Sequence, residues 1–378
     1  MDDDQTQAPA AAGLHERGPM LNRQPYDPKK VLFGLLVVSV LVMLPYLRAK
    51  STPGNYEFGG QTMGTYFKVQ IARTDRSTGE VRAFTKQVDH LLGTINRQMS
   101  TYDPESQISR FNASSETNAP FSVAPQFARV AGRALAIAQM TGGAFDPTVG
   151  PLVEVWGFAD ERTDRRRIPS AEAIEAARSR SGASRLTVST NSIRKAHPET
   201  EIDLSAIAKG YAADAITELA TRRGFENVFV EVGGEIAALG SSPARSPWRV
   251  AIEVPRHGAP VGADPWFATV TLSDAGIATS GDYRNYFESE GRLYGHIIDP
   301  RTGYPISNGV ASVSVIARDC MTADALATAL TVMGPDAGIT LVEASPGIEA
   351  LFILRTATNT LSTLSSSGFS MKRGAPHR

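Results

Sequence analysis

Cysteine is nearly absent from this chain: Cys320 is the only one in 378 residues. A disulfide within the chain is therefore excluded, and a zinc site built on cysteine thiolates is not expected. Neither sign of charge dominates, with 38 basic and 39 acidic side chains. Nucleic-acid-binding proteins usually carry a basic surplus, so we expect no nucleic-acid partner. The glycine patterns of the Rossmann fold and of the Walker phosphate loop are also missing, so a nucleotide site would have to be of another kind.

The N-terminus consists of a polar segment followed by an apolar one. Residues 1–28 are polar and rich in Ala, Pro and Gln, which predicts a disordered tail on the cytoplasmic side. An apolar run follows at 31–47, with basic residues on both flanks, and at roughly 17 residues it is at the short end for a membrane span. We interpret 29–50 as a single-pass signal anchor in the cytoplasmic (inner) membrane, with the globular part on the periplasmic side. A cleaved signal peptide is the alternative.

The remaining boundaries follow from composition and pattern. Residues 51–61 contain Pro and Gly and are predicted to form a linker, 62–364 a single globular domain, and 365–378 a flexible tail. Helical spacing predicts helices from about Glu80, over 125–141 and 170–181, and from Ser205 to just before Gly224. Strand-like runs then dominate, among them 228–232, 248–254 and 296–298. Because helices and strands are partly segregated, we expect an α+β fold with mixed, largely antiparallel sheets and packed helices.

One carboxylate stands out near the C-terminus. Asp324 lies in an apolar helical segment of small residues, and Thr328 follows four residues later, so both oxygens point to one side of the helix. A lone buried carboxylate is costly unless a positive charge faces it, and a hard divalent cation would supply that charge. The simpler alternative is an Asp that caps backbone N–H groups at a helix start.

A lysine is placed against the expected electrostatics of its helix. Lys209 lies in the first turn of the helix that begins near Ser205, where a positive charge opposes the helix dipole. A bound anion would explain this placement, since the N–H groups of a helix N-terminus favour phosphate.

Several Gly-rich or polar clusters interrupt the strand pattern, and in their order along the chain they resemble those of one family, the bacterial FAD:protein FMN transferases (ApbE family). The resemblance covers nearly all of the globular part, from about Thr62 to about Leu354. It is carried by Met63-Gly-Thr65, Met99-Ser-Thr-Tyr102, Phe145-Asp-Pro-Thr-Val-Gly150, Asp203-Leu-Ser-Ala-Ile-Ala-Lys-Gly-Tyr211, Val232-Gly-Gly234, Thr279-Ser-Gly-Asp-Tyr283, His296-Ile-Ile-Asp-Pro300 and Thr322-Ala-Asp-Ala-Leu326.

This resemblance implies an ApbE-like fold and an enzyme. Members of the family cleave FAD at its pyrophosphate and transfer the FMN part to a Thr or Ser hydroxyl of a target protein, and AMP leaves. The implied cofactor is Mg²⁺, the implied substrate is FAD, and the implied partner is an acceptor protein subunit of a membrane redox complex. Compared with many members, this chain lacks a lipoprotein cysteine and carries Ser205 where glycine is common.

The resemblance also assigns roles to residues. It implies that Asp324, Thr328 and the backbone carbonyl of Ala206 bind the metal ion, and that Lys209 lies near the pyrophosphate or the metal. His296 is the expected general base on the incoming hydroxyl, because its pKa suits neutral pH. Trp156 is either a pocket residue or a core residue. The positions that match the FAD site of the family are Met63, Tyr102, Asp146, Lys209, Ser280, Gly281, Asp282 and His296.

Two other functions remain open from the sequence. The first is a Mg²⁺-dependent FAD pyrophosphatase, in which water replaces the protein hydroxyl at the same site. The second is a non-catalytic FAD-binding protein, which would not need His296 and Asp324, although both are present.

Overall fold

The computed structural model describes Ser39 and residues 53–159, 167–258, 266–356, 358 and 360–373. The predicted tail at 1–28 and, apart from Ser39, the predicted anchor at 29–50 lie outside these residues. Within the described ranges, no helix has the length and apolar character that crossing a membrane requires.

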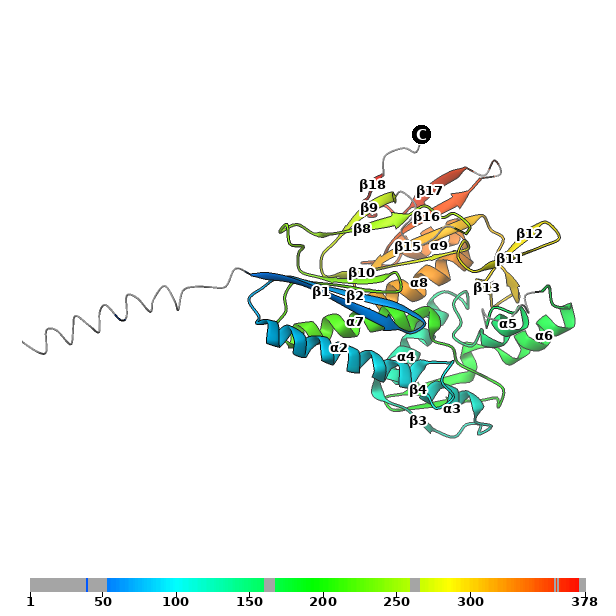
Figure 1. The fold of residues 1–378 in the computed structure, drawn as a ribbon. Helices are drawn as coiled ribbons and strands as arrows, with labels where there is room; N and C mark the ends of the chain where they lie inside the picture. The colour runs from blue at the N-terminus through cyan, green and yellow to red at the C-terminus, as the bar shows by residue number, and fades with distance from the viewer. Residues whose placement is uncertain are drawn as a thin grey trace, which may run out of the picture. The chain divides into compact units, whose positions relative to one another are not determined.

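The centre of the fold is an eight-stranded sheet with the order β1-β2-β6-β7-β10-β15-β16-β17, in which every neighbouring pair is antiparallel (Figure 1). This confirms the prediction of an α+β fold with largely antiparallel pairing. The strands are β1 (Gly54–Thr62), β2 (Thr65–Thr74), β6 (Val228–Val232), β7 (Glu235–Leu239), β10 (Ala275–Gly281), β15 (Val310–Ala317), β16 (Glu349–Arg355) and β17 (Leu361–Ser365).

Helices cover one face of this sheet. Side chains of helices α2, α4, α7 and α8 pack on the strands in one hydrophobic core. Helix α2 begins with a complete capping box, in which Ser77 and Glu80 satisfy each other's backbone N–H groups. The helices are α2 (Thr78–Met99), α3 (Gln107–Ala113), α4 (Pro125–Met140), α5 (Gly150–Val155), α6 (Ala171–Arg180), α7 (Ser205–Arg222), α8 (Cys320–Met333) and α9 (Pro335–Glu343).

A second, three-stranded sheet covers the opposite face, in the order β18-β9-β8 (Lys372–Arg373, Trp266–Leu272 and Trp248–Glu253). Strand β16 shows how the sequence permits two covered faces. Ala350 and Phe352 point to the helical core, whereas Leu351 and Ile353 point to the core beneath β8 and β9. A strand with apolar residues at consecutive positions is buried on both sides, so the described part of the chain from residue 53 onward has three layers (Figure 1).

Small elements surround these layers. A three-stranded sheet is formed by β3 (Phe121–Ser122), β5 (Ser192–Lys195) and β4 (Leu186–Ser189), and the turn η1 (Ala183–Arg185) precedes β4. Two hairpins, β11–β12 (Tyr286–Ser289, Arg292–Gly295) and β13–β14 (Ile298–Asp299, Tyr304–Pro305), lie in the chain between β10 and β15.

Three sequence-based boundaries differ from the structure. Most of the predicted linker at 51–61 is strand β1, because its alternating residues pair with β2. The predicted tail at 365–378 is ordered through residue 373, where β18 pairs with β9 and Phe369 is buried. His296 lies in a bend between β12 and β13 and not in a strand over 296–298.

Candidate functional site

The site begins where helices α7 and α8 touch. Gly210 makes this contact possible, because a Cβ at this position would lie 2.4 Å from the carbonyl oxygen of Cys320 and 2.8 Å from Cβ of Asp324. Asp214, one turn further along α7, accepts hydrogen bonds of 2.8 Å from the backbone N–H groups of both Cys320 and Met321. Burial raises the pKa of Asp214 to about 7, against the effect of these two amides. A glycine and a carboxylate on α7 therefore fix the start of α8.

Asp324 is buried, with 3% of its surface exposed, and its Oδ2 accepts a hydrogen bond of 2.9 Å from the backbone N–H of Gly210. Burial raises the pKa of Asp324, although Lys209 and this amide oppose the rise. In a regular α-helix the N–H of Gly210 would bond to the carbonyl of Ala206. Ala206 instead has non-helical angles (φ −88°, ψ 16°), so the helix is kinked where the carbonyl was expected to bind a metal ion.

A second buried carboxylate faces the same place. Glu235, at the start of β7, forms an ion pair of 3.2 Å between its Oε1 and Nζ of Lys209. Its Oε2 is buried without a hydrogen-bond partner. Burial raises the pKa of Glu235 to about 8 against the attraction of Lys209. Burial also opposes the charge of Lys209, but Asp324 and Glu235 outweigh it and the pKa of Lys209 is raised.

The third side of the site comes from β10 and the next turn of α8. Thr328 follows Asp324 by one helical turn, and its Oγ1 lies 3.0 Å from Oγ of Ser280. Gly281 follows at the end of β10, where a Cβ would lie 2.7 Å from the carbonyl oxygen of Ala311. The close packing of β10 against its neighbour thus requires a glycine there and keeps the space beside Ser280 open.

His296 is held by backbone contacts. The backbone N–H of His296 donates to the carbonyl of Asn285 at 2.9 Å. The imidazole Nδ1 lies 3.1 Å from the same carbonyl oxygen. The ring of Phe158 meets the imidazole edge to face at 6.5 Å between centroids. If Nδ1 carries the proton for the Asn285 carbonyl, Nε2 is left as the basic nitrogen, which is the state that a general base needs.

One cavity of about 1200 Å³ joins these groups. This volume exceeds the usual range for a small-ligand pocket, about 300–1000 Å³. Eight of the eleven site residues predicted from the sequence line it: Tyr102, Ala206, Lys209, Ser280, Gly281, His296, Asp324 and Thr328. Tyr102 is 78% exposed at its rim, as a platform for an aromatic ring would have to be before the ligand binds.

The other three predicted residues do not line the cavity. Met63 occupies the turn between β1 and β2 with a positive φ of 51°. Asp146 forms a local turn in which Oδ1 accepts from the backbone N–H and the hydroxyl of Thr148. Asp282 pairs with Arg355 at 3.1 Å.

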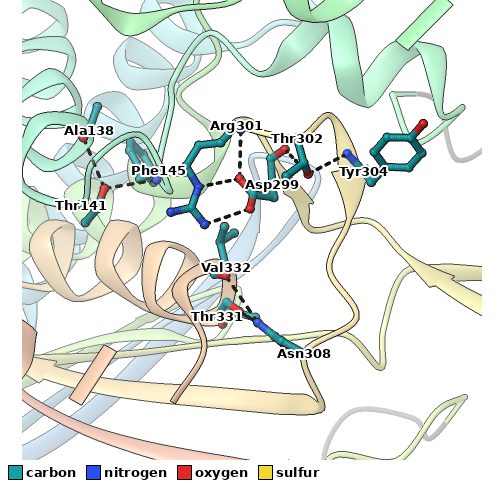
Figure 2. A network of polar contacts seen from close by, with 10 residues as sticks. All are labelled: Ala138, Thr141, Phe145, Asp299, Arg301, Thr302, Tyr304, Asn308, Thr331 and Val332. Carbon is teal, nitrogen blue, oxygen red and sulfur yellow. Dashed lines mark hydrogen bonds and ion pairs between the residues drawn. The ribbon is translucent and has the colours of Figure 1, made fainter. Parts of the chain in front are cut away.

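Two neighbouring sequence features are structural. Trp156 is fully buried, and its Nε1–H donates to the carbonyl of Gly303, so it is a core residue. Asp299 begins a turn, in which its carbonyl accepts a hydrogen bond of 2.8 Å from the N–H of Gly303. Figure 2 shows Arg301 folded back so that its guanidinium forms two hydrogen bonds with the Asp299 carboxylate.

Glu235 was not among the predicted site residues, although it directly follows the Val232-Gly-Gly234 motif. An acidic residue directly after Gly233-Gly234 was the available signal, because the tight turn brings it back over the neighbouring strand. Asp203, Tyr66 and Glu231 also line the cavity without having been predicted.

Comparison with known proteins identifies the family of the chain. The profile of the ApbE family matches residues 63–352. A protein from Vibrio cholerae serotype O1 named FAD:protein FMN transferase is 42% identical over 298 residues, which cover 79% of this chain and 86% of that protein. A protein of the same name from Haemophilus influenzae is 35% identical over 345 residues, which cover 90% of this chain and 97% of that protein.

Solved structures give the same result. The flavin transferase ApbE from Vibrio cholerae superposes with a TM-score of 0.72 at 38% identity, over 84% of this chain and 98% of that one. The apo form of the Pseudomonas stutzeri flavinyl transferase ApbE gives a TM-score of 0.73 at 36% identity, over 84% of this chain and 96% of that one. The chain belongs to the ApbE family.

Proposed function

We propose that this protein transfers FMN from FAD to a Thr or Ser hydroxyl of a target protein in a Mg²⁺-dependent reaction that releases AMP. The activity in the names of its relatives supports the proposal. The observation that carries it is the convergence of Asp324, Thr328, the kinked Ala206 and Lys209 on one cavity.

The residues present fit a divalent cation. Asp324 and Glu235 bring two buried acidic groups to the site against the one ammonium group of Lys209, and a bound cation would favour the ionised forms of both acids. The donors that would hold Mg²⁺ are all oxygens: the Asp324 carboxylate, the Thr328 hydroxyl and the Ala206 carbonyl. When bound, Mg²⁺ would neutralise charge on the pyrophosphate of FAD.

The chain's own residues then serve a displacement at phosphorus. His296 takes the proton of the acceptor hydroxyl, whose oxygen forms a bond to the phosphorus of the FMN part. The bond from that phosphorus to the bridging oxygen of the pyrophosphate breaks, and the bridging oxygen leaves with AMP. Lys209 places a positive charge beside the phosphates, and Glu235 holds the Lys209 ammonium at 3.2 Å.

A mass measurement tests this reaction. The compact unit that begins at Thr52 would be incubated with FAD, Mg²⁺ and the purified soluble domain of a flavin-carrying redox-complex subunit from the same organism. We expect the acceptor to gain the mass of one FMN, and EDTA to prevent the gain. Free FMN and AMP without a mass gain would favour the FAD pyrophosphatase, and FAD bound but unchanged would favour a binding protein.

The proposed function also includes a position at the cytoplasmic membrane. The apolar run at 31–47 and its basic flanks support a single-pass anchor in the cytoplasmic membrane, with the catalytic domain on the periplasmic side. The acceptor would then be a subunit of a membrane redox complex on that side. Protease added to spheroplasts should digest the globular domain of the full-length protein; its protection there would contradict the proposed orientation.

A further inference from the structure

The cavity extends well beyond the groups that act on FAD. From Lys209 and Glu235 it continues past β6 to the three-stranded sheet, where it touches five consecutive residues of β8, from Arg249 to Glu253. Side chains of a strand alternate between its two faces, so a space that touches every successive residue runs along the edge of the strand.

That edge of β8 has no neighbouring strand in the described part of the chain. Strand β8 is the last in the order β18-β9-β8, and its ladder from Trp248 to Glu253 pairs with β9 alone. On the side away from β9, alternate residues of β8 therefore present their backbone N–H and C=O groups to the cavity.

The outer face of the large sheet forms the other wall of this groove. Phe229 and Glu231 on β6 line it together with Tyr66 on β2. The Tyr66 hydroxyl donates to Glu231 at 2.6 Å, and the ring of Phe229 packs on Trp248 at 5.4 Å, so this wall is fixed to the start of β8. Trp266, which is 46% exposed, also lines the groove.

We infer that this groove binds the acceptor protein, by adding an extended segment that carries the acceptor Thr or Ser as a further strand on the free edge of β8. The inference rests on the proposed function, which requires a polypeptide hydroxyl to reach the same cavity as FAD. The groove leads directly to His296, Lys209 and Asp324.

Strand addition would also hold the acceptor hydroxyl in a fixed position beside the reacting groups. Main-chain hydrogen bonds hold a segment in register without requiring a particular sequence, while the strand direction sets which side chain points to the reacting atoms.

The experiment blocks the groove after the protein has folded. Ala251 is half-buried in the middle of the β8 edge, and the native Cys320 is fully buried, so Ala251→Cys introduces a thiol that a bulky methanethiosulfonate reagent can label selectively. Ser362→Cys, on the exposed edge strand β17 of the large sheet, is the matched control with the same label. Both proteins are assayed with an acceptor that the unlabelled enzyme already flavinylates, so a failure of the proposed function is detected first.

We expect the label on Ala251→Cys to raise KM for the acceptor about tenfold or more, since it removes main-chain pairing, with KM for FAD unchanged. Reduction of the label should restore the original value, and labelled Ser362→Cys should behave like the wild type. An unchanged KM for the acceptor at complete labelling, confirmed by intact mass, would overturn the inference. An equal rise in KM for FAD would overturn it as well, because the groove would then belong to the FAD site.

Discussion

The backbone N–H of Gly210 donates to Oδ2 of Asp324 across 2.9 Å, and this bond joins the two helices on which the site is built. The same glycine lets the helices approach, because any side chain would collide with the carbonyl of Cys320. Asp324 is thus positioned by the neighbouring helix and not by α8 alone. The geometry of the site and the packing of α7 on α8 depend on one residue without a Cβ.

Substitution of Gly210 should therefore affect stability and activity together. Gly210→Ala forces a methyl group to 2.4 Å from a backbone oxygen, so the helices must separate. We expect the free energy of unfolding to fall by about 1–3 kcal/mol, the usual cost of overpacking, as measured by urea denaturation, with transfer activity strongly reduced. Gly93→Ala is the control: the nearest atom to its Cβ is the flexible Arg97 guanidinium at 3.5 Å, so stability should be equal or higher.

Asp324→Asn should abolish FMN transfer and leave the fold intact. The amide keeps the volume of the side chain and an acceptor for the Gly210 N–H, but it removes the charged metal ligand. Calorimetry should show loss of Mg²⁺ binding, and urea denaturation without metal should show a change within about 1 kcal/mol. Normal transfer by this variant, at a defined Mg²⁺ concentration in buffer freed of other divalent ions, would contradict the metal assignment.

His296→Ala should slow turnover while sparing FAD binding. Loss of a general base typically costs about 10²–10⁴ in rate, so kcat should fall within that range while the dissociation constant of FAD stays close to that of the wild type. The control is His257→Ala, since His257 lies 3.8 Å from Asp282 and does not line the cavity. If His296→Ala instead loses FAD binding and keeps its turnover at saturation, His296 is a binding residue.

The pKa of Glu235 predicts a pH dependence of stability. Its pKa is raised from 4.5 to about 8 by burial, so the folded protein keeps this proton in a range where the unfolded chain releases it. The wild type should therefore lose stability as pH rises from about 4.5 to about 8, relative to Glu235→Gln, which has no proton to lose. Urea denaturation of both proteins in EDTA at several pH values measures this difference. A constant difference across that range would show that Glu235 is ionised in the folded state.

Local signals in the sequence pointed to Asp324, Thr328 and Lys209, and the resemblance to the ApbE family supplied the other predicted residues of the site. The four-residue spacing of Asp324 and Thr328 indicates that they share one side of a helix, and Lys209 stands out because its charge lies in the first turn of a different helix. Glu235 and the β8 edge were not found because their roles depend on pairing between distant segments. No local pattern shows that Glu235 meets Lys209, or that β8 ends its sheet beside the cavity.

In the fold, too, elements with a local sequence pattern were predicted and elements that depend on distant pairing were not. Helix α2 was predicted from its apolar spacing, and α7 from Ser205 onward, because periodicity is a local property. Strand β1 was assigned to a linker because its residues are mostly exposed or half-buried and its glycines suggested flexibility. Its strand structure comes from pairing with β2, where a Cβ at Gly59 would lie 2.4 Å from the carbonyl of Phe67.

Cys320 gives the last prediction, which also supports the labelling experiment. The residue is fully buried at the start of α8, its thiol donates weakly to the carbonyl of Ile277, and burial raises its pKa well above the ordinary value. Since the thiolate is the reactive form, the folded protein should not react with a thiol reagent at pH 8, whereas denaturant should release one thiol per chain. Rapid labelling of the folded wild type would show that α8 opens at its start, and the Asp214 contacts with Cys320 and Met321 would then be too weak to fix Asp324.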